Sequence, residues 1–317
     1  MRALACPASL KGVLSPLEAA AHLAAGMRRV PGLEVDELPV ADGGEGTAEV
    51  LESSLGGEWR SAVVQDPFGR PVTASWLVLP DGTAVVEAAA AIGLPLLTVA
   101  ELDPLRASSW GFGELLAAAV ASSPPLVVAC LGGTATVDGG AGMLAAIGTR
   151  IEGIPLRVAC DVRNPLLGER GAARVFGPQK GADAAAVAEL ERRLEAMSVL
   201  RPYRELRGAG AGGGLGAALA AVGGELVEGA ELVLELIAFD VLARGAVLVI
   251  TGEGTVDATT FEGKAPGAVV KHCEALGVRC ELFGGVVHVG GALPLSGSPE
   301  LAAEDLAQLG EELALSI

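Results

Sequence analysis

The sequence has 317 residues, of which 51% are apolar, 19% charged and only 3% aromatic. This length fits about two domains, and the apolar share supplies ample material for a sizeable core, so we expect a folded chain. The formal net charge of −17 argues against nucleic acid and anionic membranes as partners, because both require basic patches.

No apolar run reaches the roughly 18 to 20 residues that a membrane helix needs. The first residues, 1–7, are too short and too broken an apolar stretch for a signal peptide. We therefore expect a cytoplasmic protein with no membrane partner. The five cysteines are an odd number without a C-x-x-C pair, which predicts buried free thiols rather than a disulfide framework or a zinc site.

From the N-terminus onward, the sequence repeats one pattern, in which a short apolar strand leads through a loop into a helix. A strand expected at 2–6 leads through a loop carrying Lys11 to a helix after Ser15, where Pro16 and Glu18 are typical of a capped start. The pattern recurs after strands expected at 33–40, 126–131 and 246–251, and more weakly after 279–283. Such alternation predicts βαβ units and largely parallel sheets, in which ligands bind beyond the carboxyl ends of the strands.

Three stretches differ from this pattern. Residues 63–87 alternate in polarity and are broken by turns, which predicts a small antiparallel piece and a domain boundary near residue 65. Asp183 is expected to cap a long scaffold helix that runs to about Met197. The glycine-rich run at 208–216 leaves two alternatives open, a flexible linker or a loop whose backbone approaches a phosphate.

Two loops share the pattern D-G-G-x-G, at 42–46 and at 138–142. Each places a carboxylate at the end of an expected strand, where glycines let the backbone come close to a ligand. A single loop of this kind is more often a simple turn. Two copies in matched strand and helix contexts favour a ligand site.

Phosphoryl transfer requires a divalent metal with oxygen ligands and positive groups around the moving phosphate. The chain offers residues of both kinds. The candidate carboxylates are Asp42, Glu45, Asp138, Asp161, Glu253 and Asp257, and the candidate cations are Lys11, Lys180 and Lys264. Lys264 stands at an expected helix start, where the helix dipole favours an anion, although the spacing fits a solvated surface lysine equally well.

Other chemistries lack their motifs. The sequence contains no G-x-x-x-x-G-K-[ST] loop and no G-x-G-x-x-G after a strand. Of the three histidines, His22 and His272 fall within expected helices, which leaves little support for a Ser-His-Asp triad or a histidine metal site. Cys160 has no base suggested by the sequence and is interpreted as a small buried strand residue.

Seven segments, in order along the chain, resemble the type I glycerate kinase family. They are SLKG at 9–12, ADGGEGT at 41–47, DGGAG at 138–142, ACDVRNPL at 159–166, FGPQKGA at 176–182, GAGAGGGLG at 208–216, and TGEG at 251–254 continuing through Asp257 to Gly263 and Lys264. The resemblance covers nearly the whole chain, and the ordered set is far more specific than any single segment.

This resemblance implies an α/β protein with two α/β domains, one flavodoxin-like or Rossmann-like and one restriction-endonuclease-like, and with the active site in the cleft between them. We expect a discontinuous domain at 1–65 plus 240–317 and an inserted domain at 66–239. The implied activity is the ATP- and Mg²⁺-dependent phosphorylation of D-glycerate to phosphoglycerate. The alternatives are a kinase of another small hydroxy acid and an inactive nucleotide-binding relative.

The residues and the resemblance together give a set of expected site residues. The expected catalytic residues are Lys11, Asp42, Asp138 and Asp161. The expected cofactor-binding residues are Gly43, Gly44, Glu45, Gly212, Gly213, Gly252, Glu253, Asp257 and Lys264. The Mg²⁺ ligands are expected among Asp42, Asp138, Asp161 and Glu253. The identity of the base, the position of the phosphate on the product and the formation of a homodimer stay open.

Three residues depart from the usual pattern of the family, which has Asp at the position of Ala8, Asn at that of Val137 and Gln at that of Thr259. Each departure removes or changes a polar group beside the expected site, and such a loss could weaken or alter substrate binding. The chain is also shorter than usual within 148–156 and around 197–205. Trimmed loops are tolerable because the entropy of loop closure changes slowly with length.

Overall fold

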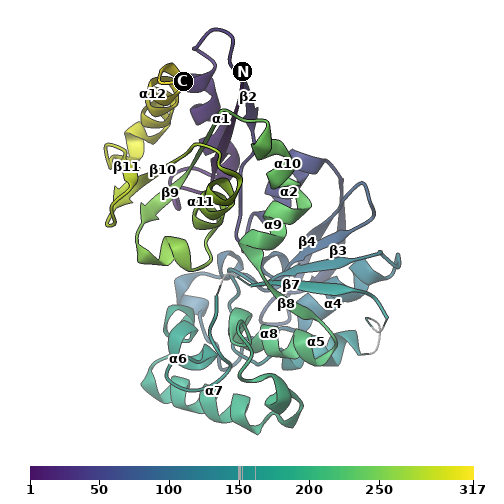
Figure 1. Ribbon diagram of the computed structural model, residues 1–317. Helices are drawn as coiled ribbons and strands as arrows, with labels where there is room; N and C mark the ends of the chain where they lie inside the picture. Colours follow the sequence, from purple (N-terminus) through teal and green to yellow (C-terminus); the bar gives the residue numbers. More distant parts are fainter. Residues whose placement is uncertain (149–150, 152, 161) are drawn as a thin grey trace. The chain divides into compact units, whose positions relative to one another are not determined.

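A computed structural model of the protein describes residues 1–148, 151, 153–160 and 162–317 (Figure 1). The chain forms two compact units. Unit 1 comprises Met1–Asp42, Glu49–Ser54 and Ala230–Ile317, and unit 2 comprises Gly43–Ala48 and Leu55–Gly229. Each unit holds one sheet with its helices, so the expected two-domain α/β class is confirmed. The expected boundaries at residues 65 and 239 compare with changes of unit after Ser54 and after Gly229.

Unit 1 is built on a five-stranded parallel sheet. Its strands, in spatial order, are β11 (Ala292–Pro294), β10 (Cys280–Val287), β9 (Leu248–Val256), β1 (Arg2–Pro7) and β2 (Glu34–Glu37). Numbered within the unit, this is the order 2-1-3-4-5 seen in flavodoxin-like sheets. Ligands of such sheets bind at the carboxyl ends of the strands where the order reverses, which here lies between β1 and β9. The assignment of either unit to a named fold stays a prediction.

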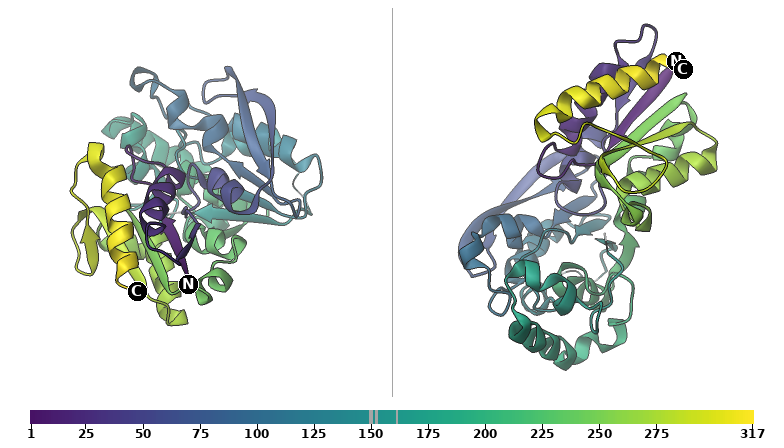
Figure 2. Two further views of the ribbon diagram at one scale, coloured as in Figure 1. Left: turned by 90° about the horizontal axis from the view of Figure 1, so that it is seen from above. Right: turned by 90° about the vertical axis from the view of Figure 1, so that its left-hand side faces the viewer.

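Helices cover both faces of this sheet. The helices α1 (Pro16–Met27) and α12 (Ala302–Leu315) lie side by side, and the two chain ends lie close together (Figure 2). Their close approach needs glycine, because a Cβ at Gly26 would lie 1.8 Å from the carbonyl oxygen of Ala307. The predicted cap of α1 is confirmed, since the Glu18 amide donates to Ser15 Oγ and the Ser15 amide to the Glu18 carboxylate. The other helices of this part of the chain are α2 (Thr47–Leu55), α9 (Gly229–Leu236), α10 (Phe239–Arg244) and α11 (Ala265–Leu276).

Unit 2 is built on a six-stranded mixed sheet. In spatial order its strands are β3 (Glu58–Gln65), β4 (Pro71–Val78), β5 (Ala84–Glu87), β6 (Val127–Cys130), β7 (Leu156–Cys160) and β8 (Glu225–Glu228). The strands β3, β4 and β5 pair antiparallel, which confirms the predicted antiparallel piece, and β5 to β8 pair parallel. Because β3 pairs with β4, the residues just before the expected boundary at 65 belong to this sheet.

The helices of unit 2 enclose an apolar core of small aliphatic side chains with few aromatic ones. They are α3 (Ala89–Ile92), α4 (Trp110–Val120), α5 (Ala141–Ile147), α6 (Ala172–Phe176), α7 (Ala184–Ala196) and α8 (Ala211–Ala221). Phe112 and Leu116 of α4 pack in the core against strand residues such as Val86. The predicted cap of α7 is confirmed, since the Ala186 amide donates to Asp183 Oδ1 at 2.8 Å.

Four of the five cysteines are buried and Cys280 is half-buried, which agrees with the predicted burial of the thiols. Among the residues that the structure describes, no helix has both the length and the apolar character needed to span a lipid bilayer.

His272 on α11 joins three helices of unit 1. Its Nδ1 lies 2.6 Å from Asp240 Oδ1 on α10, and its Nε2 lies 2.7 Å from Glu231 Oε2 on α9. Burial by itself would lower the pKa of His272, but the hydrogen bonds and charges of the two carboxylates outweigh it and raise the pKa above its ordinary value. Lys271 also pairs with Glu231, so the cluster carries two cations and two carboxylates when His272 is protonated.

This cluster predicts a stability that depends on pH. Because the folded-state pKa of His272 is raised, its contribution to the free energy of unfolding is fully present below about pH 6.5 and is lost as pH rises through the folded-state value. We expect urea unfolding to show that the advantage of the wild type over His272→Gln shrinks between about pH 6 and about pH 8. A difference between the two proteins that is constant over this range would contradict the assignment.

Candidate functional site

The expected site residues divide between the two units. Unit 1 holds Lys11, Asp42, Gly252, Glu253, Asp257 and Lys264, and unit 2 holds Gly43, Gly44, Glu45, Asp138, Gly212 and Gly213. Asp161 lies outside the described residues. The D-G-G-x-G loop at 42–46 is therefore split, because Asp42 belongs to one unit and its glycines belong to the other.

Glu253 and Lys264 form a pair at the carboxyl end of the unit 1 sheet. Gly252 is level with Pro7, the last residue of β1, so Glu253 lies just beyond the end of that strand. The Lys264 ammonium lies 3.2 Å and 3.3 Å from the two carboxylate oxygens of Glu253, and Thr260 Oγ1 donates to the same carboxylate at 2.7 Å. The Glu253 side chain is only 13% exposed. Lys264 is thus a partly exposed cation that pairs with Glu253 at the start of α11, and its role toward a phosphate stays a prediction.

Asp257 begins the short helical turn η5 (Ala258–Glu262) that follows β9. Its Oδ1 accepts hydrogen bonds from Thr259 Oγ1 at 2.5 Å and from the Thr259 amide at 2.8 Å, and these bonds lower the pKa of Asp257. Thr259 is one of the departures from the family pattern. Its hydroxyl keeps a polar contact at this position, so the departure leaves the loop locally satisfied.

The loop after β1, which carries Lys11, lies along the end of β9. The Ala8 amide donates to the carbonyl of Gly252 at 2.9 Å, and the Gly254 amide donates to the carbonyl of Ser9 at 3.3 Å. A Cβ at Gly254 would lie 3.3 Å from the backbone nitrogen of Lys11, so a glycine here permits the close approach. Lys11 itself is exposed. The expected residues Lys11, Gly252 and Glu253 therefore meet at the point where the strand order reverses.

In unit 2, three glycine loops touch one after another. The first loop comprises residues 43–48, the second residues 131–140 and the third residues 208–216. A Cβ at Gly132 would lie 2.5 Å from the Cα of Gly44, so the first and second loops are in backbone contact. The Gly139 amide donates to the carbonyl of Gly213 at 3.1 Å, which joins the second loop to the third. A Cβ at Gly213 would lie 2.0 Å from the carbonyl oxygen of Thr136. Side chains at these contacts would push the loops apart.

These loops gather at the carboxyl ends of parallel strands. A Cβ at Gly43 would lie 2.7 Å from the Cβ of Ala159, and one at Gly208 would lie 3.1 Å from the Sγ of Cys160, both near the end of β7. The second loop follows β6 directly. This is the position where α/β sheets bind their ligands. Cys160 is buried, as the sequence suggested.

The glycine run at 208–216 is not a linker. Its residues are buried apart from Gly212, which is half-buried, and all of them lie inside unit 2. Gly212, Gly213 and Gly214 have successive φ angles of 59°, 72° and 100°, a left-handed path that other residues rarely adopt. The run packs closely against the backbone at Thr136, and a role in binding phosphate stays a prediction.

Asp138 is held by four hydrogen bonds from its own unit. Its Oδ2 accepts from Ser109 Oγ at 2.8 Å, from the Ser109 amide at 2.9 Å and from the Gly142 amide at 3.2 Å, while Oδ1 accepts from the Gly140 amide at 3.0 Å. A carboxylate has about four acceptor sites, two on each oxygen. Oδ2 is therefore saturated, and a ligand would be bound through Oδ1.

Glu87 was not among the expected site residues. It ends β5 and accepts from the Ala48 amide at 2.7 Å and from the Gly46 amide at 3.4 Å, so it fixes the first glycine loop. A carboxylate at the end of an expected strand is the sequence signal that could have identified it. The structure also buries Lys180, a candidate phosphate cation, to 3% exposure beside the second loop.

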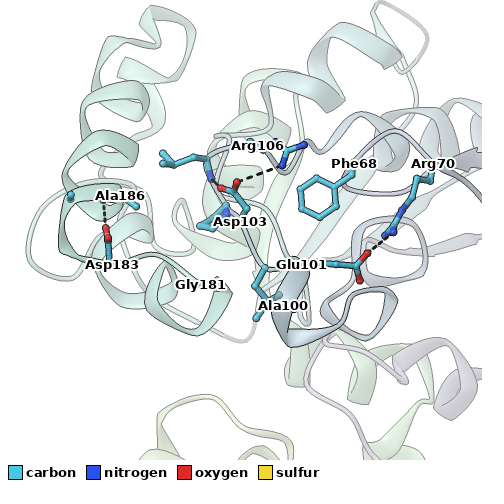
Figure 3. Close-up of a pocket in the computed structure, with 13 residues that line it drawn as sticks. Phe68, Arg70, Ala100, Glu101, Asp103, Arg106, Gly181, Asp183 and Ala186 are labelled. Carbon is cyan, nitrogen blue, oxygen red and sulfur yellow. Dashed lines mark hydrogen bonds and ion pairs between the residues drawn. The ribbon is translucent and has the colours of Figure 1, made fainter.

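A separate cavity of about 890 Å³ opens in unit 2 (Figure 3). Arg70 there pairs with Glu101 at 2.6 Å, and the Arg106 guanidinium lies 5.6 Å from the centre of the Phe68 ring. Its wall is formed by Phe68, Arg70, 100–106, Gly181, Asp183, Ala185 and Ala186, and includes none of the expected site residues. The charged groups of the cavity are of both signs and are largely paired. The cavity is therefore not interpreted as the site of phosphoryl transfer.

Within the described ranges, no three His, Cys, Asp or Glu side chains gather closely enough to form a metal-binding group. Mg²⁺ commonly binds through only one or two carboxylates, with water and substrate phosphate oxygens completing its coordination. The expected Mg²⁺ ligands therefore stay a prediction.

The contact between Gly213 and Thr136 predicts an unusual sensitivity to one methyl group. Gly213→Ala should lower the free energy of unfolding by roughly 2 to 4 kcal/mol, because it adds left-handed strain and a clash. The matched control is Gly223→Ala, which has a φ of 94° but open space around its Cβ, and should lose only about 1 to 2 kcal/mol. Equal losses in urea unfolding would show that the backbone contact is not as tight as described.

Known proteins resemble this chain over most or all of its length. The profile described as "Glycerate kinase family" matches residues 3–153 and 149–297. A glycerate kinase of Bacillus subtilis (strain 168) is 36% identical, with 100% of this chain and 98% of the relative covered. A glycerate 2-kinase of Escherichia coli (strain K12) is 38% identical over 91% of this chain and 88% of the relative. A crystal structure described as a candidate glycerate kinase 2 from Salmonella typhimurium LT2 is 33% identical, covers 100% of this chain and 98% of its own, and has a TM-score of 0.86. The chain belongs to the glycerate kinase family.

Proposed function

We propose that this protein transfers the γ-phosphoryl group of ATP to a hydroxyl of D-glycerate, with Mg²⁺ as its metal cofactor. The observation that carries the proposal is the convergence of glycine loops on Asp138 and on the carboxyl ends of β6 and β7, in a chain that matches glycerate kinases along its length. Phosphoryl transfer depends on positioning and on stabilising charge, and glycine loops with few fixed side chains suit both.

The donor set fits Mg²⁺, a hard cation that prefers carboxylate and phosphate oxygens. Asp138 keeps an acceptor site on Oδ1, and Asp42, Glu253 and Asp161 are the further proposed ligands. When bound, Mg²⁺ offsets the negative charge on the phosphate oxygens. The Asp138 carboxylate is already oriented by Ser109 and by the glycine amides, so it needs little reordering on binding.

The proposed phosphate cations are Lys11 and Lys264. Lys264 is held near the site by Glu253 and could exchange that carboxylate for a phosphate. Lys11 is exposed at the carboxyl end of β1, and its long side chain can reach an incoming anion. Gly43, Gly44, Glu45, Gly212, Gly213, Gly252 and Asp257 are proposed to line the nucleotide and substrate positions. One aspartate, Asp42 or Asp138, orients the glycerate hydroxyl.

The departures from the family pattern bear on the substrate. Val137 is 1% exposed and packs in the apolar core of unit 2. The departure at this position therefore changes the core. Thr259 supplies its own hydroxyl to Asp257. Of the three departures, only Ala8 removes a polar side chain from the loop that carries Lys11. D-Glycerate therefore stays the proposed substrate. We propose position 2 for the phosphate, as the name of the E. coli relative indicates, and the cytoplasm as the place of action.

A coupled assay of ADP release tests this proposal. Purified protein with ATP and Mg²⁺ should turn over D-glycerate far faster than lactate or tartronate. Faster turnover of another hydroxy acid would assign the protein to that acid. Binding of ATP without turnover of any acid would identify an inactive relative and overturn the proposal.

Asp42 gives a second prediction. Asp42→Asn should lower kcat at least about a hundredfold, because it removes a carboxylate proposed to bind metal or to orient the substrate hydroxyl. The matched control is Asp36→Asn, which removes the partner of Arg2 on β2 in the same unit and should leave kcat close to that of the wild type. Activity of Asp42→Asn near the wild-type level would remove Asp42 from the site.

A further inference from the structure

Lys180 is a cation buried in the interior of unit 2. It ends the helical turn η3 (Pro178–Lys180) and is only 3% exposed. Its ammonium donates to the carbonyl oxygen of Thr136 at 2.8 Å and to Thr134 Oγ1 at 3.1 Å. Within the described part of the chain, Asp138 is the charged group that favours the ammonium, and it makes no direct ion pair with it.

Such a residue does not serve stability. Burial of an ammonium without a directly paired carboxylate destabilises the folded state. The same burial lowers the pKa of Lys180 to about 7, and Asp138 only partly opposes this effect. A methionine of similar length would fill the space without that penalty. A lysine at this position is therefore explained by the groups that its ammonium binds.

The ammonium holds the stretch that leads from β6 to Asp138. Residues 135–137 have no regular secondary structure. The Thr136 hydroxyl is buried and has no hydrogen-bond partner among the described residues, so Lys180, and not the Thr136 side chain, fixes this residue. The carbonyl that Lys180 binds is also the one that Gly213 approaches. One ammonium thus fixes the second glycine loop at the point where it meets the third.

We propose that Lys180 is a positioning residue for phosphoryl transfer, which sets the path of residues 134–138 and thereby the place of the Asp138 carboxylate and the contact with the third glycine loop. This inference rests on the proposed kinase function. Lys180 acts through Thr134 and Thr136 and does not itself contact the reacting atoms. Its role belongs to turnover rather than to folding.

Lys180→Met separates these two roles. We expect kcat to fall about tenfold to a hundredfold, as for a small misplacement of catalytic groups, while KM for ATP and glycerate changes less than about threefold. The urea midpoint at neutral pH should stay close to that of the wild type, because relief from burying the cation offsets the loss of its hydrogen bonds to Thr134 and Thr136. A purely structural lysine would give a lower midpoint together with a proportionate loss of active protein, and that outcome would overturn the inference.

A second variant and a control make the test independent of one substitution. Thr134→Val keeps the shape of Thr134 but removes one acceptor of the ammonium, so kcat should fall in the same direction by a smaller factor. Arg192→Met removes a cation that is 73% exposed on α7 of the same unit, and it should change neither kcat nor the midpoint. Wild-type kcat in both Lys180→Met and Thr134→Val would contradict the inference.

Amide hydrogen exchange gives a readout that does not require kinase activity. The amides of Ala135 and Gly139 donate to Ile92 and Gly213 at 2.8 Å and 3.1 Å. They should exchange faster in Lys180→Met than in the wild type, while amides of α7 keep their rates. If wild-type protein fails to phosphorylate glycerate, the proposed function fails, but this comparison still decides on the positioning role. Unchanged exchange at Ala135 and Gly139 would overturn it.

Discussion

The site in unit 2 depends on backbone contacts that only glycine allows. Where Gly213 faces Thr136, a Cβ would lie 2.0 Å from a carbonyl oxygen, and the contact between Gly132 and Gly44 is nearly as close. Because no side chains separate the loops, main-chain groups from distant parts of the sequence meet at the ends of β6 and β7. Such a surface suits phosphate, which is recognised by backbone amides as well as by side chains.

Each unit carries a candidate cation among the charged residues of the expected site. The protein is strongly acidic overall, with a net charge of −17, and yet its proposed ligands are anions. Two candidate cations are held by specific partners within their own units, Lys264 by Glu253 in unit 1 and Lys180 by Thr134 and Thr136 in unit 2. A local positive group, together with a bound metal, can reverse the potential in a small region of an acidic protein.

Many of these features can be predicted from the sequence, because they depend on residues that are close together along the chain. The caps at Ser15 and Asp183 depend on residues only three positions apart, and the strand and glycine-loop pattern places Asp138 at a strand end. The sequence does not reveal that Glu87 fixes the loop at 43–48, or that Lys180 is buried against Thr136, since both contacts join residues about forty positions apart. Composition could not distinguish a flexible linker from a packed loop at 208–216, because glycine is common in both. The resemblance supplied the substrate and the cofactors, which no local pattern contains.

The central claim, that these loops and carboxylates form a glycerate kinase site, is tested most directly by the phosphorus NMR spectrum of the product formed from D-glycerate, ATP and Mg²⁺. The account predicts a new phosphomonoester resonance of 2-phosphoglycerate that grows as ADP appears in equal amount. A spectrum in which ATP persists unchanged, or in which only inorganic phosphate forms with ADP, would contradict it.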